Sequence, residues 1–86
     1  MNKIVKYQVP MNQEFSLDIP QDSRILNVQI LDSNPVLWVL IDDSKYQVTT
    51  NFLLYTSESP IPSTDNLSYI GSFSFNSFEG HLFRKN

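Results

Sequence analysis

The chain has few of the side chains that carry out catalysis. His81 is its only histidine, and the 86 residues include no cysteine. A site built on two imidazoles, and any thiolate nucleophile or zinc site, is therefore excluded within one chain. On a strand, His81 would face the same way as Glu79 and Phe83, and a carboxylate on a neighbouring strand would tune it as a general base. We favour an ordinary strand histidine over this alternative and expect the protein not to be an enzyme.

Aspartates form the second group that could do chemistry. Asp42 and Asp43 follow the most apolar run of the chain, and Asp32 lies across a predicted hairpin from them. Carboxylate oxygens in such a cluster suit calcium or magnesium. Aspartates at turns also bond their own backbone and keep sheet edges soluble, and we favour this second interpretation. The sequence thus predicts no metal site and no cofactor.

Aromatic side chains are plentiful, with one tryptophan, four tyrosines and six phenylalanines. Such rings could form a stacking platform for single-stranded nucleic acid, but those platforms lie inside a basic groove. Here the formal net charge is −3, and the six lysines and arginines are scattered along the chain. We therefore expect the aromatic residues to fill a core, and nucleic acid is not an expected partner.

The element that organises the chain is the run Val36–Ile41, which contains the only tryptophan, Trp38. Six consecutive apolar residues are long enough for a strand buried on both faces and too short for an ordinary helix. Because side chains alternate along a strand, Trp38 faces away from Leu37 and Val39. We expect one face of this strand to fill the core and the other to pack on a loop or a second subunit.

Six further strands are predicted around this central one. Apolar and polar residues alternate in the flanking segments, and proline or clusters of Asn, Asp and Ser separate them, as in strands joined by turns. Four turn residues, Asp32 to Pro35, predict an antiparallel hairpin. The predicted strands are Lys3–Val9, Glu14–Ile19, Arg24–Leu31, Val36–Ile41, Lys45–Thr56, Leu67–Phe75 and Phe78–Phe83.

Two of these strands carry predictions about side-chain direction. Leu26, Val28 and Ile30 are expected to share the core face of their strand. In Lys45–Thr56 the alternation slips near Asn51, which suggests a bulge or a bend that would let one strand serve two sheets.

The last part of the chain carries its own local predictions. Tyr69, Gly71, Phe73 and Phe75 are expected on one face, and Gly71 marks a bulge or a close backbone approach. Asn76 and Ser77 form a two-residue hairpin turn, and the basic end, Arg84 to Asn86, is expected to be frayed.

Taken together, these elements predict one domain over residues 1–86. Its class is all-β, a single small antiparallel β-sandwich or barrel of about six to seven strands. No run approaches the roughly 20 apolar residues that a bilayer span requires, so we expect no membrane association. A small chain without disulfides is more typical of a reducing compartment, which predicts a cytoplasmic protein.

Several short segments resemble a family of small uncharacterised β proteins encoded by phages and prophages. The resemblance covers nearly the whole chain, although the family often has glycines where this chain reads Tyr55 to Ser59. It implies an accessory protein in the host cytoplasm, with no assigned reaction. The segments that carry it are Ile4–Tyr7, Ile25–Gln29, Leu37–Asp42, Pro60–Pro62, Tyr69–Ser72 and His81–Phe83.

The function expected from these features is non-enzymatic binding. With the phage resemblance, the partner is expected to be a host protein or a small-molecule ligand, and the effect to be the blocking or sequestering of a host defence protein or its small signalling molecule. The alternative is a structural or assembly accessory protein of the virion. Edge strands and surplus aromatics also predict a homo-oligomer. The expected binding residues are Trp38, Asp42, Asp43, Glu58, Pro60, Ile61 and Pro62.

Overall fold

The computed structural model describes the whole chain, Met1–Asn86, and contains seven strands. The expected all-β class is confirmed, and every strand pair is antiparallel. No helix capable of crossing a membrane is present. The strands are β1 (Asn2–Gln8), β2 (Glu14–Pro20), β3 (Arg24–Leu31), β4 (Asn34–Asp42), β5 (Gln47–Thr56), β6 (Leu67–Phe75) and β7 (Phe78–Lys85).

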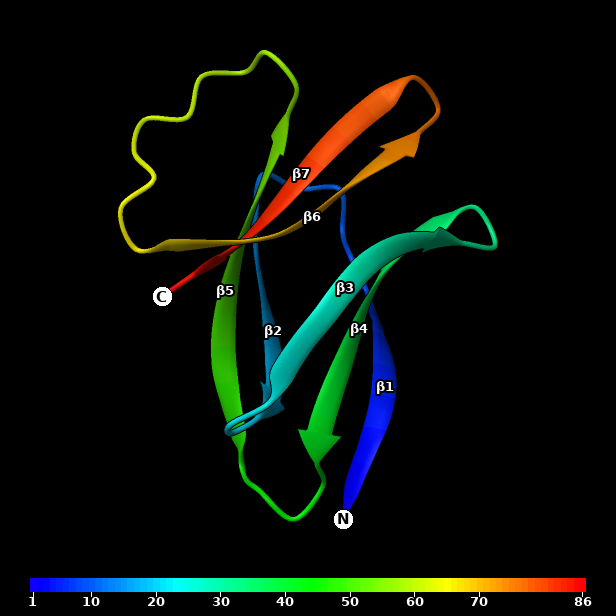
Figure 1. Cartoon of the computed structure of the whole chain (residues 1–86), viewed down its shortest axis with the longest axis vertical. Coiled ribbons are helices and arrows are strands. Elements are labelled where there is room, and N and C mark those ends of the chain that lie inside the picture. Colours follow the sequence, from blue (N-terminus) through cyan, green and yellow to red (C-terminus); the bar gives the residue numbers. More distant parts are fainter.

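The strands form two sheets that pack as a small sandwich (Figure 1). One sheet has three strands in the order β1-β4-β3, and the other has four in the order β2-β5-β7-β6. The predicted hairpin between β3 and β4 is present. The Trp38 strand, β4, is the centre of the three-stranded sheet, as its apolar run predicted.

The core lies between the sheets and is built from alternate residues of each strand. On β4, Leu37 and Val39 are fully buried, whereas Trp38 between them is half-buried on the outward face. On β5, Phe52 and Leu54 face inward and join the same cluster. The expected split of the β4 run into a core face and an outer face is therefore confirmed.

Two β-bulges reverse the expected direction of nearby side chains. The β3–β4 register shifts between Ile25 and Asn27, and the β6–β7 register shifts between Tyr69 and Gly71. An inserted residue moves its neighbours to the other face of a sheet. Leu26 is consequently 41% exposed, so its predicted place on the core face was wrong. Tyr69 is 62% exposed whereas Phe73 is buried, so the prediction that these two share one face was also wrong. The bulge or close approach predicted at Gly71 is confirmed.

The bulge predicted at Asn51 is wrong, and so is the expectation that this strand would serve two sheets. Asn51 pairs with Ser16 on β2 and with Lys85 on β7, and neither register shifts there. The alternation slips because Leu53 and Tyr55, on the outer face, are buried together with the inward residues of β5. Strand β5 accordingly serves one sheet only.

The β3–β4 and β6–β7 hairpins each turn through two residues with positive φ. Asn76 and Ser77 have φ of 48° and 65°, and Asp32 and Ser33 have φ of 51° and 66°. This is the backbone of a type I′ turn, which matches the twist of antiparallel strands. The turn predicted at Asn76-Ser77 is confirmed, although neither residue is glycine.

The chain end is more ordered than its basic sequence suggested. Arg84 pairs with Phe52 on one side and Ser68 on the other, and the Asn86 N–H donates to the Asn66 carbonyl at 2.7 Å. The predicted fraying at Arg84–Asn86 was therefore wrong for these residues, because two neighbouring strands hold the end of β7.

Candidate functional site

The residues expected to bind a partner lie in three separate places. Trp38 occupies the middle of the outward face of the three-stranded sheet, between Lys6 on β1 and Asn27 on β3. Its neighbour on β1, Ile4, is 59% exposed. Lys6 and Asn27, on either side of Trp38, are also exposed.

Asp42 and Asp43 lie at the end of β4, where they hold the start of the chain. The Met1 amine donates to a carboxylate oxygen of each at 3.1 Å, and Lys3 Nζ lies 3.5 Å from Asp43 Oδ2. The Ser44 hydroxyl and N–H also donate to Asp42 at 2.7 and 3.0 Å. No cluster of metal-binding side chains is formed by these or other residues. Asp42 thus bonds the backbone of its own turn, as expected, whereas the Asp43 carboxylate binds the Met1 amine and Lys3.

The cluster makes a pH prediction. Hydrogen bonds from Ser44 depress the pKa of Asp42, and the hydrogen bond from the Met1 amine depresses the pKa of Asp43 below its ordinary value of 3.8. Because the folded-state pKa values of both carboxyls are lowered, their ionised forms stabilise the fold above about pH 4, and this contribution is lost as the pH falls through the folded-state values. The hydrogen bonds to Asp42 and Asp43 raise the pKa of the Met1 amine, so the contribution of the amine is lost as the pH rises through its folded-state value. Acetylating the Met1 amine should raise the Asp43 pKa more than that of Asp42, as measured by NMR titration of the carboxyls. An unchanged Asp43 pKa would contradict the assignment.

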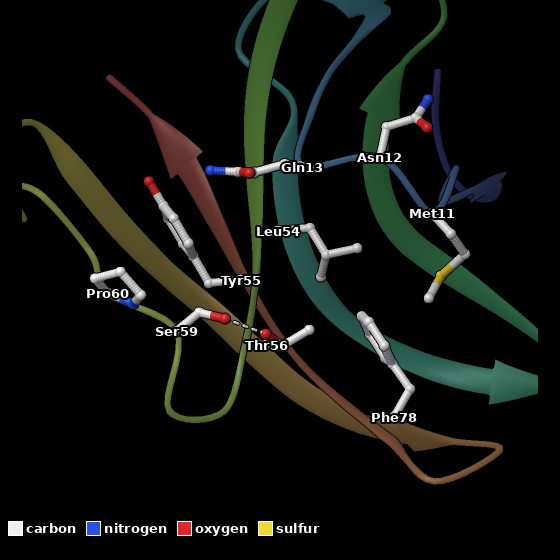
Figure 2. Close-up of a pocket in the computed structure, with 9 residues that line it drawn as sticks. All are labelled: Met11, Asn12, Gln13, Leu54, Tyr55, Thr56, Ser59, Pro60 and Phe78. Carbon is white, nitrogen blue, oxygen red and sulfur yellow. Dashed lines mark hydrogen bonds between the residues drawn. The ribbon is translucent and has the colours of Figure 1, made fainter.

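Glu58, Pro60, Ile61 and Pro62 lie on the long connection between β5 and β6. All four are exposed. Pro60 contributes to a cavity of about 330 Å³ at the end of β5. Figure 2 shows that its lining residues do not converge, since Tyr55, Ser59 and Pro60 lie on one side of β5 and Leu54, Met11 and Phe78 on the other. No charged residue lines this cavity.

His81 sits in a chain of hydroxyl groups on the outer face of the four-stranded sheet. Its Nε2 lies 2.8 Å from Ser57 Oγ and its Nδ1 lies 2.6 Å from Ser72 Oγ, which in turn lies 2.5 Å from the Tyr69 hydroxyl. Its cross-strand neighbours are Tyr55 and Ser72, not the carboxylate considered from the sequence. These contacts fasten the start of the β5–β6 connection to β7.

A different cavity, unforeseen from the sequence, gathers the features expected of a binding site. It has a volume of about 430 Å³ and lies where the start of β3 meets the start of β6 and the end of β7. Both arginines of the chain line it, together with other polar residues and three aliphatic ones. The lining residues are Ser23, Arg24, Ile25, Leu26, Ser68, Tyr69, Ile70, Arg84 and Asn86.

Both β-bulges of the molecule contribute to the lining of this basic cavity. The extra residue of β3, Leu26, and that of β6, Ile70, both line it. Bulges interrupt the regular ladder and re-aim side chains, and they are frequent beside functional sites. The strands approach closely here because Gly71 lacks a side chain, and a Cβ at this position would lie 3.1 Å from Val28 Cγ1.

The charge of the basic cavity is uncompensated. Neither Arg24 nor Arg84 makes a salt bridge, and no carboxylate is among the lining residues. Asp22 precedes Ser23 in the adjoining turn and is the acidic residue nearest in sequence to the lining. On the rim, Asn86 Nδ2 donates to Ser68 Oγ at 2.8 Å. Guanidinium groups with free donors, beside hydroxyls and an apolar wall, suit an anion attached to a small organic body.

Sequence reasoning missed this site because its residues come from both ends of the chain. Arg24 and Arg84 are the only arginines, which is a weak signal by itself. They are brought together by the packing of β3 on β6, which involves no hydrogen-bonded pairing between these strands.

Comparison with known proteins gives a family but no function. No curated protein and no solved structure matches the chain. One family model, described as "Domain of unknown function (DUF7352)", matches residues 1–86. Since the match spans the full length, the chain belongs to the DUF7352 family.

Proposed function

We propose that this protein is a non-enzymatic binding protein that captures a small anionic ligand in the basic cavity. The observation that carries the proposal is the meeting of both arginines and both β-bulges around one cavity in a chain of net charge −3. Two guanidinium groups recognise phosphate or carboxylate oxygens through paired N–H donors. Leu26, Ile25 and Ile70 would contact the apolar part of the ligand.

The biological setting belongs to the proposal as well. The resemblance to phage and prophage proteins supports a phage-encoded protein in the host cytoplasm, where it sequesters a small signalling molecule of host defence. The second candidate partner in the same setting is a host defence protein, bound at the surface of the chain. A virion structural or assembly accessory role is the alternative, and copurification with particles would distinguish it.

The anion-binding role is tested by thermal unfolding with and without pyrophosphate, followed by a panel of nucleotides. A ligand that binds the folded state stabilises it by about 2.7 kcal/mol at a hundredfold excess over its Kd. We expect the unfolding temperature to rise with ligand concentration, and Arg84→Gln to abolish most of that rise. Lys45→Gln is the matched control, because Lys45 is exposed and outside the basic cavity.

Two results would overturn the proposal. One is the absence of any shift with millimolar pyrophosphate and with every nucleotide tested. The other is an equal loss of the shift in Lys45→Gln and Arg84→Gln, since this would indicate general charge attraction without a site.

A further inference from the structure

The sandwich is closed on one side and open on the other. On the closed side, β3 of the three-stranded sheet packs against β6 of the four-stranded sheet. The strands at the other ends of the two sheets are β1 and β2, joined by the short connection Val9–Gln13. Each of these edge strands has seven residues and pairs with only one neighbour, β4 and β5 respectively.

The core is incompletely covered along this open side. Val5 and Tyr7 of β1 and Phe15 and Leu17 of β2 pack against the core cluster, yet all four remain partly exposed. Outside the sheet ladders, residues 2–8 and 14–19 make no main-chain hydrogen bond. An edge strand in this state is a template for pairing with another chain.

The two open edges carry opposite charges. Strand β1 has Lys3 and Lys6 and no acidic residue, whereas β2 has Glu14 and Asp18 and no basic residue. Lys6, Glu14 and Asp18 make no salt bridge within the chain. On their strands, Lys6 pairs with Trp38, and Asp18 pairs with Thr49, so both side chains belong to the outer faces of the sandwich.

We propose that the open side binds a second copy of the chain, with β1 of each copy pairing antiparallel to β2 of the other. A two-fold axis parallel to the strands places the three-stranded sheet of one copy beside the four-stranded sheet of its partner. At each of the two β1–β2 junctions, the three-stranded sheet of one copy and the four-stranded sheet of the other form one continuous sheet. The partly exposed apolar residues of β1 and β2 then meet across both junctions. The interface is isologous and closed, so it ends at a dimer.

Charge selects this pairing over the alternatives. Pairing β1 with β1 would bring four lysines together, and pairing β2 with β2 would bring four carboxylates together. Lysine on an edge strand opposes pairing with another basic strand. Its electrostatic interaction with the pairing strand becomes favourable when that strand is acidic. The β1–β2 arrangement is the one in which both edges gain opposite charges.

The test is a charge exchange followed by sedimentation equilibrium. Lys6→Glu and Asp18→Lys should each weaken the dimer by about tenfold or more, because the symmetry places each like-charge contact twice in the interface. An equimolar mixture of the two variants should recover dimers, since every junction in the mixed pair joins opposite charges. Asp65→Lys, on the β5–β6 connection and away from both edges, is the matched control and should dimerise like the unmodified chain. Circular dichroism confirms that each variant is folded.

Three outcomes would overturn the inference. The unmodified chain could remain monomeric at millimolar concentration. Asp18→Lys could leave the dimer unchanged while Lys6→Glu alters it, which would indicate pairing through β1 alone. The mixture could also fail to recover dimers when both single variants are weakened. None of these measurements depends on the anion-binding proposal.

Discussion

Replacing Phe52 with alanine is expected to lower the free energy of unfolding by about 3–5 kcal/mol, the usual range for a fully buried phenylalanine. Phe52 is 1% exposed and stacks on Phe15, with ring centroids 5.2 Å apart. It lies on β5, which connects β2 to β7, so its loss leaves a cavity where the four-stranded sheet faces the core. In a domain of this size, the unfolding temperature should fall by at least about 12 °C.

Trp38→Ala is the control for this experiment. Trp38 is a larger side chain, but it is half-buried on the outer face, so its removal should cost about 1–2 kcal/mol in the monomer. Urea unfolding of both variants gives the comparison. A greater loss for Trp38→Ala than for Phe52→Ala would show that the outer face of β4 is covered in solution.

Strand positions could be predicted from the sequence because they depend on local patterns. The alternation in Glu14–Ile19 and the unbroken apolar run of Val36–Ile41 each specify a strand without reference to the rest of the chain. Turn residues between them, such as Asp32-Ser33, separate one strand from the next. Local chemistry was therefore sufficient for the all-β class and for the central place of β4 in its sheet.

Side-chain direction failed where the ladder is irregular. A strand with a bulge reads like a strand without one, since only the partner shows which residue is extra. Simple alternation placed Leu26 on the core face and Tyr69 on the same face as Phe73, and the bulges turned both Leu26 and Tyr69 outward. At Asn51 the error was the opposite one, since a bulge was predicted where none exists. The outer-face residues that follow Asn51 are themselves apolar and buried, so the sequence stops alternating although the register does not shift.

The candidate site was beyond sequence reasoning for a related reason. Asp43 and Pro60 were chosen because they lie in connections between strands, and Trp38 because it faces away from the core, and the fold separates these three residues. The basic cavity instead depends on two bulges and on sheet packing, and of these only the bulge beside Gly71 had a signature in the sequence. Gly71 follows the extra residue Ile70 and lies close to Val28 on β3.

The second large effect is expected from Gly80, the other glycine of the chain. Gly80 is buried on β7 and has no positive φ, so an alanine there is compatible with the backbone. The difficulty is space, because a Cβ would lie 2.8 Å from Phe73 Cζ, 2.9 Å from Phe78 Cε1 and 3.1 Å from Leu54 Cδ1. Overpacking of this kind typically costs about 1–3 kcal/mol. Gly80→Ala should therefore destabilise the fold by an amount in this range, as measured by urea unfolding.

A second substitution tests whether the loss of stability comes from these close contacts or from a general intolerance of β7 to substitution. Phe73 and Phe78 have ring centroids 6.2 Å apart, and both rings must shift to admit the new methyl group. Shortening one of them with Phe78→Leu should make room, so the double variant should lose less stability than the sum of the two single variants. Additive losses would contradict the steric explanation. A combined loss smaller than the sum would mean that the absence of a side chain at Gly80 leaves the room in which the rings of Phe73 and Phe78 pack.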